Sequence, residues 1–302
     1  MQPKILMRKY ISIMGLGIYL LLGCSGKTTN QLEEQTQSSE VTKETISAKD
    51  KAKIEKMIYS IPSPVQAAIL LEKTGARFDN TYMNDVSKVS SYQTTPQIAL
   101  NIGVYGADLA YTNVYKKHVE ALKYFSIVQK LGDKIGIGYI FTPALIKRFE
   151  NNQNNQDSLI SITTDSFTEV HSHLKKNQQE DLIALMIVGG WIEALYISCQ
   201  IWEANPNKAL ATLIAEQKFS LNDVLEVVKR SPKVPELEKL KKDLTELQAI
   251  FNKIQATYAY EKTELKKEKN LAIIENQTKL HFNNDIIKKI SKLTEKIRNS
   301  II

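Results

Sequence analysis

The sequence predicts an all-α protein, built as an irregular array of antiparallel helix pairs. Four prolines directly follow a helix-capping residue, and proline is favoured at the first helical position, where its missing N–H is not needed. Apolar residues also recur at three- and four-residue spacing along most of the chain. Only 12 glycines and 8 prolines occur in 302 residues, which disfavours a turn-rich all-β fold. The four capped starts are Ser63-Pro64, Thr95-Pro96, Thr142-Pro143 and Asn205-Pro206.

Length and composition narrow the class of protein further. A chain of this length has room for about two domains. Hydrophobic residues make up 43% and charged residues 24% of the chain, which excludes a wholly disordered protein. Two cysteines are too few for a disulfide scaffold or for a zinc module with several cysteine ligands.

The first 24 residues have the features of a secretory signal. Lys4, Arg8 and Lys9 provide positive charge, and residues 10–22 form an uncharged run. This run is too short to span a bilayer, which needs about 20 apolar residues, so it fits the apolar region of a signal peptide. It ends in Leu21-Leu22-Gly23-Cys24, which resembles the lipobox of bacterial lipoproteins.

The resemblance to bacterial lipoproteins implies a diacylglyceryl thioether on Cys24, cleavage after Gly23, and acylation of the new amino group by a fatty acid such as palmitate. Two or more acyl chains anchor a protein stably, whereas a single chain does not. The alternative is an ordinary signal peptide with an incidental cysteine. Ser25, in place of Asp, implies by the same resemblance the outer membrane and its periplasmic face.

We therefore expect the membrane as a partner through the lipid on Cys24, together with a protein partner in the cell envelope. Removal of residues 1–23 also removes three positive charges, which lowers the net charge from +7 to +4. Such a mild charge does not favour a nucleic-acid partner.

The chain divides into four expected parts. Residues 1–23 are the signal peptide, and 24–47 are the lipidated cysteine and a flexible tether, since 25–46 are rich in Ser, Thr, Gln and Glu and lack aromatic residues. A helical body follows over 48–230, and a C-terminal helical pair packs on it over 231–302. We expect helices over 48–60, 63–76, 95–115, 117–134, 142–151, 157–177, 180–203, 206–218, 220–230, 235–260 and 284–300.

Two apolar stripes define the C-terminal helical pair. One keeps the spacing of heptads over 235–260 and the other lies over 284–300, and either stripe can pack on its own domain or form a coiled coil with a partner. Between them, 270–282 reads as a small β-hairpin, with two short apolar runs around a Glu-Asn-Gln-Thr turn. The first stripe consists of Leu237, Leu240, Leu244, Leu247, Phe251, Ile254 and Tyr258.

The most unusual helix is the one predicted over 95–115. Its small residues Ala99, Gly103, Gly106 and Ala110 share one face, which indicates that another helix packs very close. A second face carries polar and aromatic residues, and Glu193 lies in a similar setting on the helix over 180–203. The candidate ligand pocket consists of Asn101, Tyr105, Asp108, Tyr111, Glu193 and Tyr196.

Three interpretations of these residues stay open. They can form a structural hydrogen-bond network, since a buried carboxylate needs hydrogen bonds or a cation. They can line a ligand pocket with an aromatic wall. Asp108 and Glu193 can also act as an acid–base pair if their environments separate their pKa values.

No motif for catalysis, metal binding or a cofactor is recognisable. His171 and His173 point about 200° apart on a helix, so they do not readily share one metal ion. Cys199 lies in an apolar run and reads as a small buried residue. We expect no catalytic residues, no metal and no cofactor.

The body, too, resembles known proteins. Ile61-Pro62-Ser63-Pro64, the run NIGVYGADLAYTNVY at 101–115 and the Ile-Arg pair at 297–298 are similar to segments of functionally uncharacterised all-helical lipoproteins of Gram-negative bacteria. The resemblance implies a location in the envelope but no activity. We expect a non-enzymatic protein-binding or scaffold module. The alternative is a lipoprotein that binds a small molecule or a lipid in a pocket near Asp108 and Glu193.

Overall fold

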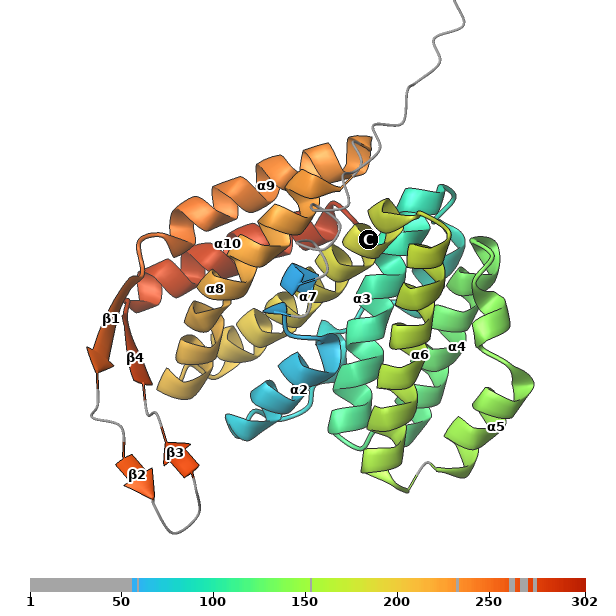
Figure 1. Ribbon diagram of the computed structural model, residues 1–302, viewed down its shortest axis with the longest axis horizontal. Coiled ribbons are helices and arrows are strands. Elements are labelled where there is room, and N and C mark those ends of the chain that lie inside the picture. The colour runs from blue at the N-terminus through green and yellow to red at the C-terminus, as the bar shows by residue number, and fades with distance from the viewer. Residues whose placement is uncertain are drawn as a thin grey trace, which may run out of the picture. The chain divides into compact units, whose positions relative to one another are not determined.

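Two long helices cross at the centre of this computed structural model, and other helices pack around them (Figure 1). Helix α3 (Thr95–Val114) is buried at every position from Ile98 to Val114, and α7 (Glu180–Ala204) is buried along most of its length. The all-α class expected from the sequence is confirmed. The structure describes residues 56–58, 60–152, 154–231, 234–260, 264–266, 271–273 and 276–302.

The elements between residues 64 and 176 surround α3. Helices α2 (Pro64–Lys73), α4 (His118–Lys134) and α6 (Gln156–Lys176) pack directly on it, and α5 (Pro143–Asn151) packs on α6. Three short 3₁₀ turns lie in the connections. They are η1 (Asn80–Tyr82), η2 (Val86–Ser90) and η3 (Gly138–Ile140).

The remaining helices cover α7. Helix α8 (Lys208–Arg230) packs on α7 and α9 (Pro235–Phe251) packs on α8, while α10 (Asn284–Asn299) lies between α7 and α9. An antiparallel strand pair leads from α9 into α10, so these two helices run in opposite directions (Figure 1). The described leucines of the first apolar stripe are at most 2% exposed. The stripe therefore packs on its own domain.

The crossing of α3 and α7 depends on glycines. A Cβ atom on Gly103 would overlap the backbone carbonyl oxygen of Met186, and one on Gly189 would overlap that of Leu100. The backbones therefore touch without intervening side chains, as the small-residue face predicts. Gly106 on the same face is different, because a Cβ there would overlap the ring of Phe167 from α6.

Three of the four proline-marked starts lie within one residue of the prediction. Ser63 and Thr142 cap α2 and α5 as expected, whereas the cap of α3 is Thr94 rather than the expected Thr95. The fourth is displaced further. Asn207 rather than Asn205 caps α8, because its Oδ1 accepts the Leu210 amide at 2.9 Å.

The prediction of separate helices over 206–218 and 220–230 is wrong. They form the single helix α8, which continues through Ser220. The hydroxyl of this serine lies 2.8 Å from the side-chain oxygen of Gln217 and accepts the Trp191 indole N–H at 2.9 Å. Because these bonds satisfy Ser220 inside the helix, it neither caps nor interrupts it.

The β structure also differs from the prediction. Helix α9 ends at Phe251, and β1 (Gln255–Tyr260) replaces the expected last turns of that helix. It pairs antiparallel with β4 (Asn276–His281), Gln255 opposite His281, so the expected turn at 275–278 is instead the start of a strand. Strands β2 (Glu264–Lys266) and β3 (Leu271–Ile273) form a second pair. A hairpin is present as expected, but its two strands, β1 and β4, are not adjacent in the sequence.

The helix crossing gives a matched pair of substitutions. Gly189→Ala is expected to reduce the free energy of unfolding by about 2 kcal/mol or more, because the new methyl group forces the two backbones apart. Gly190→Ala is expected to have a smaller effect, since its Cβ would lie 3.2 Å from the nearest atoms. Urea denaturation followed by circular dichroism measures both. Equal stability of the two variants would contradict the close crossing.

Candidate functional site

Five of the six candidate pocket residues are in the core. Asn101, Asp108 and Glu193 are fully buried, Tyr105 and Tyr111 are almost so, and only Tyr196 is partly exposed. Asp108 and Glu193 face the same interior region from α3 and α7, close enough for the charge of Glu193 to act on Asp108. Their side chains meet protein groups there rather than an open cavity.

Arg298, from α10, joins this cluster and was not singled out from the sequence. Its Nε and Nη2 donate to the two carboxylate oxygens of Glu193 at 2.9 and 2.8 Å, which is a bidentate ion pair. The guanidinium lies 4.4 Å from the ring centroid of Tyr196. Both charges are removed from water, and Asn101 adds a hydrogen bond of 2.8 Å to the Ile301 carbonyl. The C-terminal helix is thereby fixed to α3 and α7.

Asp108 does not share this ion pair. Its Oδ2 accepts the backbone amide of Asn84 at 3.1 Å, and its Oδ1 has no hydrogen-bond partner within the described part of the chain. Burial raises the pKa of Asp108 well above its usual range, and the nearby charge of Glu193 adds to the rise. The rise in pKa favours the neutral carboxylic acid at Asp108, whereas Glu193 has the guanidinium of Arg298 as its partner.

The tyrosines of the cluster hold the segment that contains η1 and η2. Tyr105 donates to the Asp85 carbonyl at 2.7 Å and Tyr124 donates to the Asn84 carbonyl at 2.8 Å, while the Tyr111 hydroxyl accepts the Asp79 amide at 2.9 Å. Each bond joins a core helix to the connection between α2 and α3, which also packs apolar side chains such as Phe78 and Tyr92 on the core. The cluster thus has the geometry of a structural network, and neither carboxylate is exposed to a substrate.

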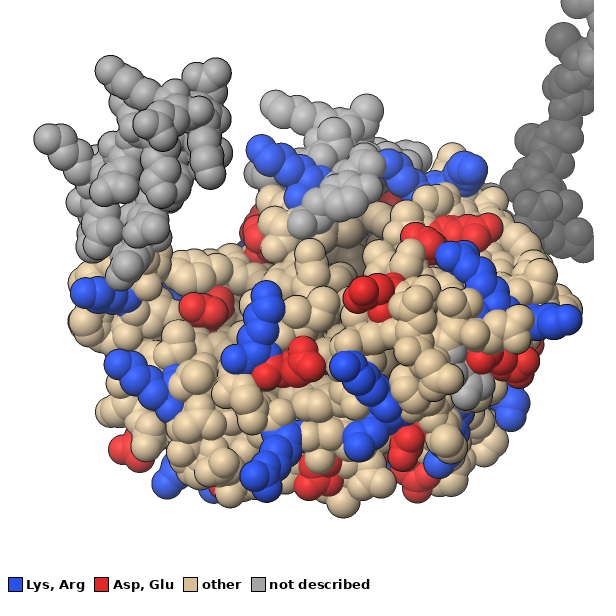
Figure 2. Space-filling model, turned by 90° about the horizontal axis from the view of Figure 1, so that it is seen from below, with Lys and Arg blue, Asp and Glu red and all other residues tan. Residues whose placement is uncertain are grey.

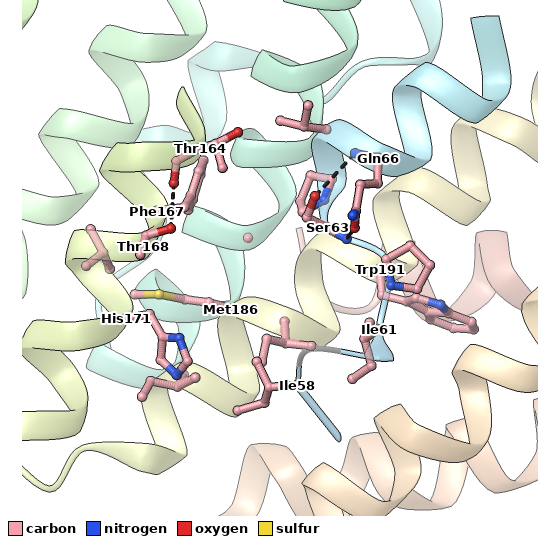
Figure 3. Close-up of a pocket in the computed structure, with 17 residues that line it drawn as sticks. Ile58, Ile61, Ser63, Gln66, Thr164, Phe167, Thr168, His171, Met186 and Trp191 are labelled. Atoms are coloured by element: carbon pink, nitrogen blue, oxygen red, sulfur yellow. Dashed lines mark hydrogen bonds between the residues drawn. The ribbon is translucent and has the colours of Figure 1, made fainter. Parts of the chain in front are cut away.

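A different part of the molecule contains an apolar cavity of about 350 Å³ (Figure 3). Its walls come from α2, α3, α6 and α7 and from the segment that precedes α2. The volume lies at the lower end of the range of small-molecule sites. The apolar lining residues are Ile58, Ile61, Pro62, Pro64, Val65, Gly103, Phe167, Val170, Ile183, Met186, Ile187 and Trp191.

The polar lining residues lie on two sides of the cavity and toward solvent. Ser63 and Gln66 come from the start of α2, where they form a capping box, and Thr164, Thr168 and His171 lie on α6 (Figure 3). No Asp, Glu, Lys or Arg lines the cavity among the residues that the structure describes. The site therefore offers an uncharged apolar interior with hydrogen-bonding groups at its entrance.

The walls of this cavity are fixed before any ligand binds. The Trp191 indole is held by its bond to Ser220, and the ring of Phe167 packs against Gly106. Gly103 contributes only backbone to the wall, at the point where α3 touches the backbone of α7. Preformed walls reduce the entropy that binding must overcome.

Sequence reasoning did not find this cavity, and none of the six candidate residues lines it. Gly103 and Trp191 were noticed, but as a packing glycine and as a neighbour of Glu193. Periodicity shows which face of a helix is buried, yet it does not show where four segments leave a gap. The proline-rich start at Ile61-Pro62-Ser63-Pro64 was the one local signal, since it brings four consecutive lining residues.

Two further hollows are more polar. One, of about 340 Å³, lies between the starts of α4 and α6 and is lined by Lys116, His118, Asn154, Asn155, Gln156 and Asp157. The other, of about 500 Å³, lies where α8 and β4 meet and includes Trp202, Lys208 and His281. On the face in Figure 2, positive and negative side chains are interspersed, without a continuous patch of one sign.

Within the described residues, no three His, Cys, Asp or Glu side chains lie together as a metal site would require. His173 hydrogen-bonds with Tyr139 and Asn177, whereas His171 lines the apolar cavity. Cys199 is fully buried, which raises the pKa of its thiol and disfavours the reactive thiolate. In the described part of the chain, α7 alone is long and apolar enough to cross a membrane, and most of it is enclosed by other helices.

Comparison with known proteins provides no relative. No protein-family model matches the chain, and no curated protein and no solved structure matches it.

The ion pair can be tested by a double-mutant cycle. Arg298→Met is expected to lower the free energy of unfolding by about 3–5 kcal/mol, because it leaves Glu193 charged and buried without a partner. The double variant with Glu193→Leu is expected to regain most of this loss, since no charge is then buried. Urea denaturation at neutral pH measures both. A double variant no more stable than Arg298→Met would contradict the account.

The raised pKa of Asp108 predicts that the free energy of unfolding depends on pH. In the unfolded chain its proton leaves near the ordinary pKa of 3.8, whereas in the folded protein it leaves at a higher pH. Loss of the proton therefore favours the unfolded chain, and stability falls as the pH rises between these two values. Asp108→Asn is expected to remove this fall and to resemble the parent protein below pH 3.8. Urea titrations across pH measure it, and an unchanged slope in the variant would contradict a neutral Asp108.

Proposed function

We propose that this protein is a lipid-anchored binding protein of the bacterial cell envelope, which holds an apolar ligand in the cavity between α2, α3, α6 and α7. The single observation that carries the proposal is the apolar, preformed lining of that cavity. A dry interior without formal charge favours the transfer of hydrocarbon surface out of water. The order of the N-terminal features, which ends in Leu21-Leu22-Gly23-Cys24, supports the anchor.

This proposal moves the ligand site away from Asp108 and Glu193. A small-molecule or lipid-binding lipoprotein was the alternative to a protein-binding or scaffold module, and the cavity now favours the alternative. The envelope protein partner and the periplasmic face of the outer membrane stay predictions. If a partner protein uses the same entrance, an apolar side chain of that protein would occupy the cavity, and a small ligand would then compete with it.

Binding can be measured with an uncharged, environment-sensitive naphthalene dye that carries a saturated alkyl chain. One dye molecule per protein is expected to bind with increased fluorescence. Ile187→Glu places a carboxylate in the apolar wall and is expected to weaken binding by about tenfold or more, because the charge must be desolvated when the dye enters. Leu70→Glu is the matched control, because Leu70 is 40% exposed on α2 and does not line the cavity. Equal dye binding by both variants would contradict the proposed site.

The anchor has a separate test. Metabolic labelling with a fatty acid is expected to label the parent protein and to leave the Cys24→Ala variant unlabelled, because the thioether needs the sulfur atom. Partition into detergent and mass spectrometry of the N-terminal peptide give the same answer independently. Label that persists in Cys24→Ala would contradict the lipoprotein assignment.

A further inference from the structure

The chemistry of the cavity lining narrows the class of ligand. Most of the apolar side chains are aliphatic, and only Phe167 and Trp191 are aromatic. The two aromatic rings are both engaged elsewhere, one against Gly106 and the other through its indole N–H to Ser220. A site for a flat ring usually presents aromatic faces and a free polar group to orient it. This lining instead suits a flexible saturated chain.

The volume limits the number of chains. A methylene group occupies about the volume of a water molecule in the liquid, about 30 Å³. A cavity of about 350 Å³ thus holds one chain of about a dozen methylenes. It has no room for both chains of a phospholipid.

The side chains at the entrance determine which polar group the ligand can carry at that end. Among the described residues the cavity lining contains no carboxylate, so a basic headgroup would find no counter-charge from them. The entrance offers a hydrogen-bond donor instead, namely the side-chain NH2 group of Gln66, whose oxygen accepts the Ser63 amide, and the imidazole of His171 lies on the opposite side (Figure 3). The first turn of α2 also directs its partial positive charge to this place. A carboxylic acid or a hydroxyl group fits these groups.

We propose that the cavity binds one saturated fatty acyl chain, with an acidic or hydroxyl head at the entrance between Ser63, Gln66 and His171. The inference rests on the proposed function and names the class of ligand for the same site. A free single-chain lipid of the envelope can supply such a chain.

The test is displacement of the naphthalene dye by saturated fatty acids of increasing length, below their micelle concentrations, from full-length Cys24→Ala protein. Each added methylene is expected to tighten binding about fourfold, which corresponds to about 0.8 kcal/mol, until the chain fills the cavity at about a dozen carbons. Alkylamines of the same length are expected to bind more weakly, because their head is cationic.

A matched pair of variants on α6 localises the chain. Thr168→Phe is expected to weaken binding of the longer acids by about tenfold, because the ring fills the entrance. Ser172→Phe, at an exposed position of the same helix that does not line the cavity, is expected to bind like the parent. Equal binding by the two variants would overturn the placement of the chain.

Dye that binds but is not displaced by any fatty acid, or displacement without dependence on chain length, overturns this inference and leaves the proposed function intact. Failure of the dye itself overturns both.

Discussion

The closeness of α3 and α7 is the constraint on which the rest of this structure depends. Gly103 meets the backbone of α7 at Met186, and Gly189 meets the backbone of α3 at Leu100. Because the two helices touch through their backbones, their polar side chains Asp108 and Glu193 come within electrostatic range of each other. Gly103 at this crossing also lies in the wall of the apolar cavity, together with Met186. The crossing therefore adjoins both the buried polar cluster and the cavity.

The polar cluster shows how a buried charge is kept in an otherwise apolar core. Glu193 receives a bidentate partner from the last helix, whereas burial raises the pKa of Asp108 and so favours its neutral form. The energetic consequence is that α10 and the C-terminal residues are part of the core rather than an appendage. A buried ion pair of this kind contributes more to the specificity of docking than to net stability.

Local signals predict local structure well in this chain. Ser63-Pro64 and Thr142-Pro143 mark helix starts because the cap and the proline act within one turn. The small residues around Gly103 predict the close crossing because they lie on one face of a single helix and leave that face without bulky side chains. Strand β1 was missed because its pairing with β4 is separated by a long stretch of chain, so an apolar run at 254–260 looks like the continuation of a helix.

The candidate site, too, was predictable only where the signal lies within one helix. The sequence identified Asp108 and Glu193 as unusual, and their burial and proximity agree with that. It did not supply Arg298, since a single arginine in an amphipathic helix is ordinarily a surface residue. A buried carboxylate nevertheless needs a partner. The expected burial of Glu193 was therefore the available signal that a cation lies beside it. The cavity is formed by side chains from four segments, and no pattern along one segment encodes its depth.

The central claim is that an acyl chain lies inside the α2–α3–α6–α7 cavity and not on another apolar surface. Methyl NMR of isoleucine-labelled Cys24→Ala protein tests it directly. On addition of a twelve-carbon fatty acid, the account predicts shifts and chain-to-methyl Overhauser contacts at Ile61, Ile183 and Ile187, with Ile287 and Ile290 of α10 unchanged. Contacts confined to other isoleucines, or a spectrum that does not change while the acid is bound, would contradict it.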